Sequence, residues 1–500
     1  MKPRPKRERE KVHSVIDVTL DAVQRRLVEL PPTGALLVLG EAGYGKTTVA
    51  LWRLAHLYRA SIEKKRRSPN ARFRAAVIVP TEGLRRLLQA MLVKLGVDVL
   101  VHVYEKFAAR QARRVFADIP RRESDDASAG TIRIKRERAL TKAIGVLAAR
   151  PRAEFDEDDD RPQISLETHA SCADLLHLFG DRVLMDRVAH DAAIALHAVE
   201  EILEHTHVQF SRTTEQASRH VDKKRLVAVD KLAIDRGTAM NDACSIDSED
   251  YAALFEIDRR RALRLNEPPS APRLYDCIVV DEAQELAPLE LALIGRSLER
   301  DGTLIVAGDA DQQVDASASF IDWPTTMRDL FCDSFETATL EVGYRCPPAV
   351  TQFARAVLAA EKSADLQTIP TMEFSTEEAL VAALDAALVK LQEADANISV
   401  AIIARTTLTA RRIAQRLTEA PRRVVLDGSF NASSGIVVTT VEQVKGLEFD
   451  TVIVPDASYA EYPDTPASRR ALYVAATRAR HQLVIMSAEK MSPIVKAKDS

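Results

Sequence analysis

The residues best suited to chemistry lie in one short stretch near the start of the chain. Residues 40–47 read Gly-Glu-Ala-Gly-Tyr-Gly-Lys-Thr and fit the pattern GxxxxGK[ST]. Glycines in such a stretch let successive backbone N–H groups point at phosphate oxygens. Lys46 then reaches the β- and γ-phosphates, and the Thr47 hydroxyl is a ligand for Mg²⁺. The stretch therefore predicts a nucleoside triphosphate site.

The alternative interpretation of this stretch is a glycine-rich turn that carries an exposed lysine. Its surroundings favour the phosphate loop, because the apolar run Ala35–Leu39 precedes it and the helical run Thr47–Ala60 follows it. A strand, a glycine loop and a helix N-terminus in this order bind anions. Only 17 of the 500 residues are glycine, so three within eight residues indicate a specific use. The predicted contacts to ATP are Gly40, Glu41, Ala42, Gly43, Tyr44, Gly45, Lys46, Thr47 and Thr48.

Two acidic residues follow the apolar run Cys277–Val280. Asp281 at the carboxyl end of a parallel strand would lie beside the phosphate loop and hold Mg²⁺ together with Thr47. Glu282 suits polarisation of an attacking water, which favours hydrolysis over transfer to a small molecule. The alternative is an ordinary strand that is followed by a helix cap.

A third polar turn follows the apolar run Leu304–Ala307 and reads Gly-Asp-Ala-Asp-Gln over residues 308–312. Gln312 is a candidate for sensing the γ-phosphate or for positioning water, because glutamine has this role in other P-loop hydrolases. The catalytic candidates thus follow three separate strands.

These residues need elements that bring them together, and the sequence predicts two sets. Apolar runs alternate with helical stretches, which is typical of parallel sheets covered on both faces. The first set lies between Ala35 and about Leu340 and the second between Leu340 and Ala488, so we predict two α/β domains. The other predicted strands are Ala75–Val79, Asp98–Val103, Thr337–Val342, Ser399–Ile403, Ile436–Thr440, Thr451–Val454 and Leu483–Met486, and Leu84–Leu95 is predicted to be helical.

Strand signals fade between about Lys106 and Leu274. Ala, Leu, Arg and Glu recur there at helical spacing, as in Arg182–His205, and this predicts a mostly helical insertion. Residues 108–152 hold 12 Lys and Arg against 5 Asp and Glu. The acidic run Glu154–Asp160 is predicted to be a solvated loop, with metal binding as the alternative.

Composition limits the class of protein. With 46% hydrophobic and 28% charged residues, the chain is not wholly disordered. No apolar run approaches the roughly 18 residues that a membrane helix needs, and no hydrophobic stretch follows the basic residues 1–11. The five cysteines lack CxxC spacing, so they indicate neither a disulfide framework nor a zinc site. We expect a cytoplasmic protein without membrane contact, and the net charge of −4 leaves nucleic-acid binding open.

The order of the motifs resembles that of superfamily 1 helicases of the UvrD/Rep type. The phosphate loop and the turns at 281–284 and 308–312 resemble the first three motifs, while 343–345, 440–449 and 472–479 resemble later ones. The resemblance implies that Gln24 reads the adenine edge, Tyr344 stacks on adenine and Glu448 contacts the ribose. It also implies that Arg345 approaches the γ-phosphate and that Arg478 acts as an arginine finger. A surface salt bridge is the alternative for each arginine.

The resemblance also implies a fold, namely two RecA-like P-loop NTPase domains with parallel sheets and a mostly helical insertion in the first. Residues 15–106 and 273–335 would form domain 1A, 107–272 a 1B-like insertion and 336–489 domain 2A, with tails at 1–14 and 490–500. ATP and Mg²⁺ would lie between 1A and 2A.

Nucleic-acid contacts are expected from the resemblance at Thr81, Tyr104, Phe107 and Thr440. Packing in a core is the alternative for Tyr104 and Phe107. The basic stretches 64–67 and 133–136 are candidates for phosphate contacts, with a solvated face as the alternative.

Three departures separate the chain from the family pattern. No Trp or Tyr follows Gln312 until Trp323, so base stacking there would fall to Phe320 or Trp323. Glu442 replaces an expected histidine, and only 100 residues separate Arg345 from Lys445, which leaves no room for a large second insertion. These departures resemble the HelD-type branch, whose members can act on RNA polymerase.

Two functions follow. The first is an ATP-dependent DNA helicase or translocase of 3′-to-5′ polarity that acts on single-stranded or tailed DNA in repair or recombination. The second is an ATP-gated remodelling subunit whose target is a protein assembly, such as RNA polymerase or a defence complex. A small-molecule kinase would leave Arg478 and residues 445–449 unexplained.

Overall fold

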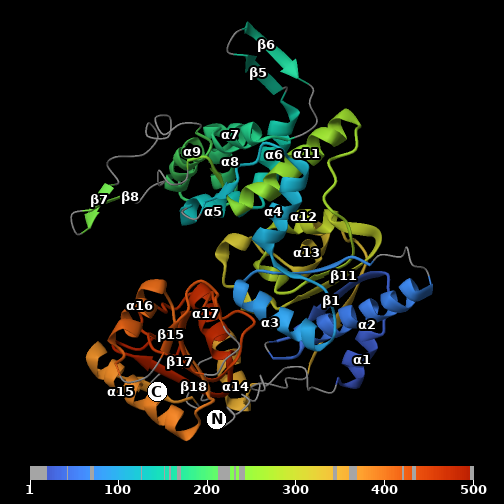
Figure 1. Cartoon of the computed structure of the whole chain (residues 1–500). Helices are drawn as coiled ribbons and strands as arrows, with labels where there is room; N and C mark the ends of the chain where they lie inside the picture. The colour runs from blue at the N-terminus through green and yellow to red at the C-terminus, as the bar shows by residue number, and fades with distance from the viewer. Residues whose placement is uncertain are drawn as a thin grey trace, which may run out of the picture.

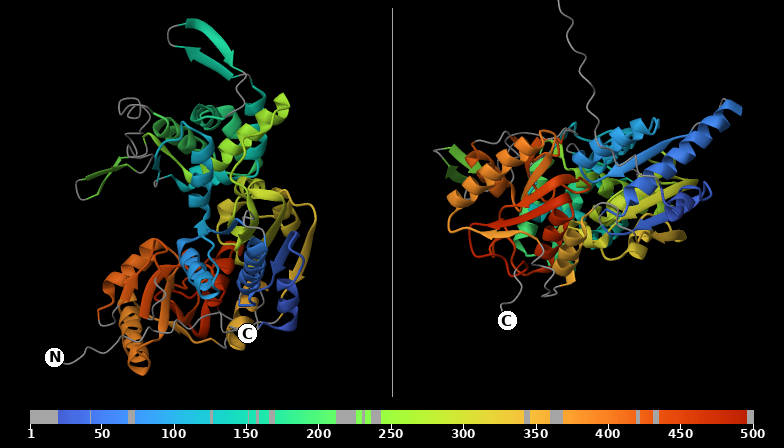
Figure 2. Two further views of the ribbon diagram at one scale, coloured as in Figure 1. Left: turned by 45° about the vertical axis from the view of Figure 1, so that its right-hand side comes forward. Right: turned by 90° about the horizontal axis from the view of Figure 1, so that it is seen from below.

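The computed structural model of the chain describes residues 20–41, 43–67, 73–124, 127–150, 152–156, 159–165, 170–211, 226–229, 232–235, 243–341, 346–359, 369–418, 422–430 and 435–495. Two six-stranded sheets lie side by side, and a group of helices lies above the first of them (Figures 1 and 2). This confirms the predicted α/β class with parallel sheets. Among the described residues, no helix combines the length and the apolar character needed to cross a bilayer.

The first sheet has the strand order β12-β1-β11-β10-β2-β3, and all its neighbours are parallel. Its strands are β1 (Gly34–Leu39), β2 (Ala75–Val79), β3 (Val101–Val103), β10 (Tyr275–Val280), β11 (Leu298–Gly308) and β12 (Phe335–Thr339). Its helices are α1 (Ala22–Val28), α2 (Lys46–Arg67), α3 (Glu82–Lys94), α4 (Tyr104–Val115), α12 (Pro288–Arg296) and α13 (Trp323–Asp329). Short 3₁₀ turns follow β10 and β11, at η3 (Ala283–Glu285), η4 (Ala310–Gln312) and η5 (Ala316–Ala318).

Alternation along the strands explains why both faces of this sheet are covered. Ala76 and Ile78 of β2 belong to one core cluster, and Val77 and Val79 belong to another. Successive side chains of a strand point to opposite faces, so an unbroken apolar strand packs two layers of helices at once. Because β11 lies between β1 and β10 and is parallel to both, the carboxyl ends of these three strands lie at the same edge of the sheet.

The second sheet has the order β13-β18-β17-β14-β16-β15 and is also parallel throughout. Its strands are β13 (Thr371–Glu373), β14 (Ser399–Ala404), β15 (Arg422–Val424), β16 (Gly435–Thr440), β17 (Phe449–Val454) and β18 (Ala479–Ser487). The helices around it are α14 (Pro348–Ala359), α15 (Glu377–Ala394), α16 (Thr407–Arg416) and α17 (Pro466–Ala476). Two core clusters cover its two faces, as in the first sheet.

Helices dominate the segment between α4 and β10. They are α5 (Ala129–Arg136), α6 (Leu140–Ala149), α7 (Cys172–Phe179), α8 (Arg182–Asp191), α9 (His197–Gln209) and α11 (Ser248–Leu265). The stretch Arg182–His205, whose residues recur at helical spacing, lies in two helices, because the chain turns at Ala193 with a φ of 51° and forms α8 and α9. Short strands also occur, as the parallel pair β4 (Arg122–Glu123) with β9 (Ser245–Ile246) and the hairpin β7 (Leu226–Val229) with β8 (Leu232–Asp235).

The acidic run predicted to be a loop is instead part of a hairpin. Its strands are β5 (Arg152–Asp156) and β6 (Asp159–Ser165), which pair in antiparallel fashion. The predicted C-terminal tail also needs correction, since Met491, Ile494 and Val495 are buried in a core cluster of the second sheet. Burial of these apolar side chains is favourable in free energy, because it removes from water the surface that a solvated tail would expose. The predicted N-terminal tail lies outside the described residues.

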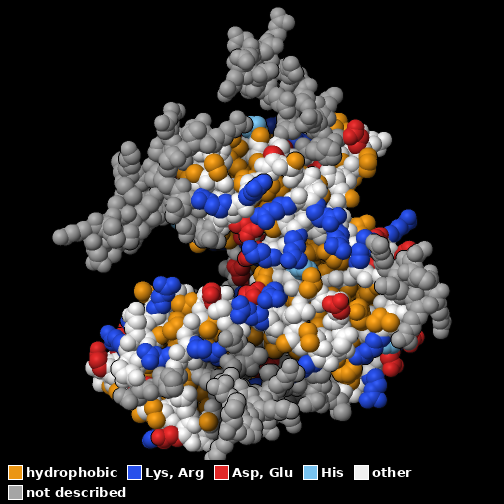
Figure 3. Space-filling view, viewed as in Figure 1, with side chains coloured by type: hydrophobic (Ala, Val, Ile, Leu, Met, Phe, Trp, Pro, Cys, Tyr) orange, Lys and Arg blue, Asp and Glu red, His pale blue; other side chains and the backbone are white. Residues whose placement is uncertain are grey.

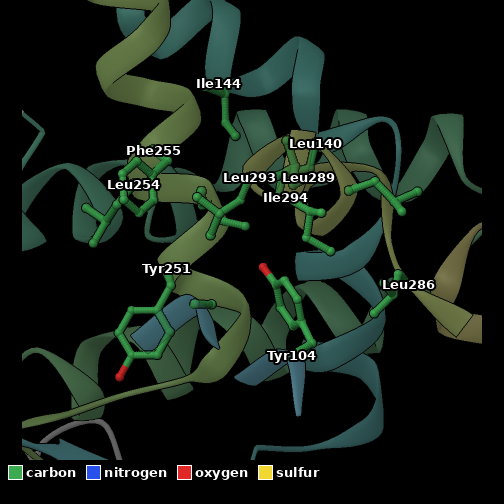
Figure 4. Packing of buried hydrophobic residues seen from close by; sticks show 14 of the residues in the cluster. Tyr104, Leu140, Ile144, Tyr251, Leu254, Phe255, Leu286, Leu289, Leu293 and Ile294 are labelled. Carbon is green, nitrogen blue, oxygen red and sulfur yellow. The ribbon is translucent and has the colours of Figure 1, made fainter. Parts of the chain in front are cut away.

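The core of the helical segment is continuous with that of the first sheet. One cluster runs from Ile78 and Val306 of the sheet through Leu289 of α12 to Ile144 of α6 and Phe255 of α11. Figure 4 shows the middle of this cluster, where Tyr104, Leu286 and Ile294 lie close to Leu140 and Leu293. The helical segment and the first sheet therefore share one packed interior.

Candidate nucleotide-binding site

The phosphate loop connects β1 to α2, and α2 begins at Lys46. Gly45 has a φ of +86°, and a Cβ there would lie 3.0 Å from Nε2 of Gln24. Gly40 faces the carbonyl oxygen of Leu340 in the same way, at 3.0 Å from where its Cβ would be. Both contacts are tighter than side chains usually make, and the φ values of Gly40 (+155°) and Gly45 are ones that other residues rarely adopt, so glycine suits both positions. Ala42 lies outside the described residues.

The Lys46 ammonium group lies inside this loop. Its Nζ donates to the carbonyl oxygens of Gly40 and Glu41 at 2.6 and 2.9 Å, and it lies 3.7 Å from Oδ2 of Asp309 at the end of β11. The side chain is only 7% exposed. A buried ammonium group at a helix N-terminus is a strong attractor for phosphate oxygens.

Thr47 and Asp281 provide two adjacent oxygen atoms. Thr47 Oγ1 donates to Asp281 Oδ2 at 2.8 Å, which joins the start of α2 to the end of β10. Burial, and then the neighbouring Glu282 carboxylate, raise the pKa of Asp281 to about 7. Mg²⁺ in nucleotide sites takes one or two protein oxygens beside phosphate and water oxygens, so this pair fits its requirements. Thr48, the residue after Thr47, is buried.

Glu282 follows Asp281 in a left-handed backbone conformation, with a φ of 55°. Such a conformation is costly for a residue other than glycine and persists where the surroundings impose it. Gln284 supplies part of these surroundings, because its Nε2 donates to Glu282 Oε2 at 2.6 Å and its Oε1 accepts from the Asp309 N–H at 3.2 Å. The carboxylate of Glu282 is thus held at a fixed place beside the ends of β10 and β11.

Gln312 meets an arginine of the second sheet. Its Nε2 donates to Asp309 Oδ2 at 2.7 Å, and its Oε1 accepts from Arg478 Nη2 at 2.5 Å. Arg478 follows α17, is 4% exposed and also donates from Nε to the Val474 carbonyl at 3.0 Å. The structure therefore brings together the two residues that the sequence assigned to γ-phosphate sensing and to the arginine finger.

Two further ion pairs link the sheets around this point. Lys445 Nζ donates to Glu285 Oε2 at 2.6 Å, and both side chains are buried. At the outer rim, Arg355 of α14 contacts Glu41 at 2.9 Å and donates to the Tyr44 hydroxyl at 2.9 Å. The phosphate loop and the turn after β10 thus each have a partner in the second half of the chain.

The remaining nucleotide candidates are placed as follows. Gln24 is buried beside Gly45 and forms a capping box with Asp21, whose Oδ1 accepts from the Gln24 N–H at 2.8 Å. Glu448 is half-buried before β17. Tyr344 and Arg345 lie outside the described residues, so their expected adenine and phosphate contacts stay predictions.

The expected nucleic-acid contacts at three positions need correction. Tyr104 and Phe107 are 4% and 1% exposed, because both side chains belong to the shared core, where Figure 4 shows Tyr104. Thr440 is buried at the end of β16. None of these three side chains can stack on or contact a nucleic-acid strand at the surface in this arrangement. The alternative interpretation, packing in a core, therefore holds for Tyr104 and Phe107. Thr81 is half-buried and caps α3 by accepting from the Leu84 N–H at 3.3 Å.

The aromatic side chains after Gln312 pack against the chain itself. Phe320 and Trp323 form an edge-to-face pair with ring centroids 5.0 Å apart. A Cβ at Gly308 would come within 2.1 Å of the Trp323 ring, so the indole covers the end of β11. Trp323 is therefore a packing residue rather than an exposed base-stacking platform.

Sequence reasoning missed the roles of Gln284, Glu285 and Asp309. Gln284 and Asp309 belong to the motifs at 281–284 and 308–312, and Glu285 directly follows the first of these. Only the fold shows that Gln284 and Asp309 join β10 to β11 and that Glu285 faces Lys445. The sequence feature that could have pointed to Glu285 was its position four residues after Asp281. The basic stretch 133–136 is corrected in part, because Lys135 and Arg136 form buried ion pairs. The side chains of residues 65–67 are not described.

Comparison with known proteins adds a family match for the second sheet. Residues 435–486, from β16 to β18, match the family described as the UvrD-like helicase C-terminal domain. A comparison with curated proteins found no match. Among solved structures, the C-terminal domain of a possible DNA helicase from Lactobacillus plantarum WCFS1 is similar at 23% identity, over 31% of this chain and 94% of that one, with a TM-score of 0.27. The family match supports a UvrD/Rep-type relationship and a helicase-type function for the part of the chain that contains Lys445 and Arg478.

Proposed function

We propose that this chain is an ATP-dependent DNA helicase or translocase of superfamily 1, which moves on single-stranded DNA with 3′-to-5′ polarity. The contact between Arg478 and Gln312 supports this most directly, because it sets an arginine of the second sheet against the candidate γ-phosphate sensor of the first. The family match over residues 435–486 supports the same class. DNA repair or recombination is the proposed setting.

The proposed domain layout follows the two sheets. Two of the predicted bounds move accordingly. Residues 15–106 and 273–340 form the first RecA-like domain, because β12 (Phe335–Thr339) pairs with β1 and not with the second sheet. Residues from 346 to 495 form the second, because Met491, Ile494 and Val495 lie in its core, and 107–272 form the helical insertion. ATP binds between the two sheets, on the side where Lys445 contacts Glu285 and Arg478 contacts Gln312.

Each residue of the site has a distinct role in this proposal. Lys46 and the loop N–H groups hold the phosphates, while Thr47 and Asp281 hold Mg²⁺. The ion, when bound, offsets the negative charge of the phosphates. Glu282 accepts a proton from the attacking water, and the hydrogen bond from Gln284 keeps its carboxylate in position.

Arg478 makes hydrolysis depend on the second sheet. An arginine supplied across a cleft stabilises the charge that develops on the γ-phosphate and is worth about 10³–10⁵ in rate. Gln312 orients this arginine through the 2.5 Å hydrogen bond. Two units that close for hydrolysis and then reopen can advance along a strand if each holds it in turn.

A basic surface supports a nucleic-acid partner. Lys and Arg side chains gather in the middle of the face in Figure 3, where the helical segment meets the first sheet. Exposed basic residues of α4 recur there at helical spacing, namely Lys106, Arg110, Arg113 and Arg114. Glu123 pairs with Lys106 at 2.6 Å and with Arg113 at 3.1 Å, so Arg110 and Arg114 offer the larger net charge to phosphates.

The test is ATP hydrolysis measured with single-stranded DNA, with RNA and without polymer, together with strand displacement from a 3′-tailed duplex. We expect stimulation by single-stranded DNA and displacement of the 3′-tailed strand, both lost in Lys46→Ala. Hydrolysis that no polymer stimulates, combined with no displacement, would falsify the proposal.

A second function draws on the burial of the aromatic side chains. Tyr104 and Phe107 are buried, and Trp323 is half-buried against the end of β11, which weakens the grip on bases that processive unwinding needs. We infer that an ATP-gated remodelling subunit acting on RNA polymerase or a defence complex is the alternative. Glu282→Gln should then trap a complex with purified RNA polymerase in the presence of ATP, and polymerase should stimulate hydrolysis more than DNA does. Capture of DNA alone by this variant would exclude the alternative.

A further inference from the structure

Residues 135–138, at the end of α5, connect the helical segment to the first sheet. Arg138 forms a bidentate pair with Asp329 of α13, at 2.9 and 2.7 Å. Glu137 accepts from the Ser319 hydroxyl at 2.6 Å. These side chains are thus bound within the chain, and we name residues 135–138 the connector.

Arg136 makes the largest set of contacts in the connector. Its Nε and Nη2 donate to the two carboxylate oxygens of Glu290 at 3.1 and 3.2 Å, and Nη2 also donates to the Glu285 carbonyl at 2.8 Å. Its Nη1 donates to Ser317 Oγ at 2.8 Å and to Asp315 Oδ2. These bonds use all five N–H donors of the guanidinium group. The side chain is 11% exposed.

The partners of Arg136 lie beside the catalytic candidates. Glu285 comes three residues after Glu282, and Asp315 comes three residues after Gln312. The Glu285 carboxylate also accepts the N–H groups of Val314 and Asp315 at 3.0 and 3.3 Å. The turn after β10 and the loop after β11 are therefore held as one unit, and Arg136 fastens this unit from the side of the helical segment.

The opposite end of the connector is fixed in the helical segment. Lys135 is fully buried, and its Nζ lies 2.6 Å from Asp247 Oδ2 and 2.7 Å from Asp250 Oδ1, at the start of α11. Removing one partner of a buried ion pair leaves an uncompensated charge, so such a pair resists separation. Two adjacent residues of α5 thus have partners in different parts of the fold. Lys135 holds α5 to α11, and Arg136 holds it to the turns that carry the catalytic candidates.

We propose that Arg136 is a positioning residue that couples the state of the nucleotide site to the orientation of the helical segment; this inference rests on the proposed ATPase function. A shift of the loop that carries Gln312 displaces Asp315 and Ser317, and the guanidinium group passes this displacement to α5. Lys135 then carries it to α11. The orientation of the helical segment on the first sheet therefore depends on the state of the nucleotide site.

Arg136→Lys tests the proposal, because lysine keeps the charge but cannot make five bonds in a fixed fork. Loss of two or more charge-assisted hydrogen bonds should reduce kcat by about tenfold or more, while KM for ATP stays within about twofold. Arg187→Lys is the matched control, since Arg187 is exposed on α8. Unchanged kcat in Arg136→Lys, or an equal loss in the control, would overturn the proposal.

A second measurement separates coupling from simple loss of structure. Hydrogen exchange of α5 should slow when wild type binds a non-hydrolysable ATP analogue, and this response should disappear in Arg136→Lys. Asp315→Asn removes charge at the same contact without altering the guanidinium group. Its effect on kcat should not add to that of Arg136→Lys, because both break one interaction. Additive effects, or a persisting exchange response, would contradict coupling.

The outcomes distinguish this inference from the function on which it rests. If Lys46→Ala hydrolyses ATP at the wild-type rate, the ATPase assignment itself fails. If Lys46→Ala is inactive while Arg136→Lys retains full kcat and its exchange response, only the coupling is rejected.

Discussion

Arg478 Nη2 and Gln312 Oε1 lie 2.5 Å apart, although 166 residues separate the two in the sequence. The Gln312 amide then donates to Asp309, whose carboxylate lies 3.7 Å from Lys46 Nζ. A continuous series of polar contacts therefore runs from the second sheet to the phosphate loop. Movement of either sheet changes the surroundings of the lysine on which phosphate binding depends.

Arg478→Lys should lower kcat for ATP hydrolysis by about 10³-fold, because an arginine finger contributes about 10³–10⁵ in rate and lysine lacks its planar fork. KM for ATP should change little, since Lys46 and the loop make the ground-state contacts. Steady-state hydrolysis checks this, with Arg480→Lys on β18 as the control at a more exposed position. A fall in affinity without a fall in kcat would exclude the finger role.

Lys46→Ala should reduce hydrolysis by roughly 10²–10³-fold, because a preorganised charge at the phosphates is removed. Binding of a fluorescent ATP analogue should weaken in parallel. Lys64→Ala on the exposed part of the same helix is the control and should match wild type. Wild-type turnover by Lys46→Ala would show that the loop does not bind the reacting phosphate.

Lys445→Met should destabilise the contact between the sheets, because Glu285 is then left buried without its ammonium partner. Breaking a buried ion pair from one side costs about 3–5 kcal/mol. Thermal unfolding followed by circular dichroism measures the loss, and Lys445→Met with Glu285→Gln should recover part of it. A double variant that loses the full sum of the two single changes would argue against a direct interaction.

Asp456→Asn should change the pH dependence of stability. Burial raises the pKa of Asp456 to about 7, above its value of about 3.9 in an unfolded chain. The folded state therefore holds a proton that the unfolded state has lost, and wild type loses stability as the pH rises from about 4 to about 7. Asparagine has no proton to lose, so the variant gains on wild type by up to roughly 1.4 kcal/mol for each unit of pH in this interval. Urea unfolding at pH 5 and pH 8 checks the sign, and a constant difference would contradict the assignment.

The central strands of both sheets were predictable, whereas the edge strands β13 and β15 of the second sheet were not. The run Ala75–Val79 is apolar throughout and forms β2 over the same residues, because both of its faces are buried. Strands β13 and β15 have three residues each and little buried surface, so their sequences carry no apolar run. The acidic hairpin β5–β6 also escaped prediction, because its sequence has no apolar run, although its two strands pair in antiparallel fashion.

The site was predictable where spacing alone determines geometry. The phosphate loop and the acidic pair stand directly after strands, and parallel strands bring their carboxyl ends together. Contacts between distant segments had no such signal, as Arg136 shows, because its partners follow it by about 150 residues or more. The expected nucleic-acid contacts at Tyr104 and Phe107 were wrong because an aromatic side chain at the start of a helix suits both a core and a base-stacking surface. Only the packing of the folded chain decides between the two.

The shared interior of the first sheet and the helical segment has a consequence for dissection of the protein. A cut near residue 107 would pass through α4, and together with a cut near residue 272 it would expose the layer formed by Tyr104, Leu289 and Phe255. Neither fragment would keep a complete interior, so the helical segment is not a portable module. It should melt together with the first sheet, while the second sheet, which has its own two clusters, melts as a separate unit.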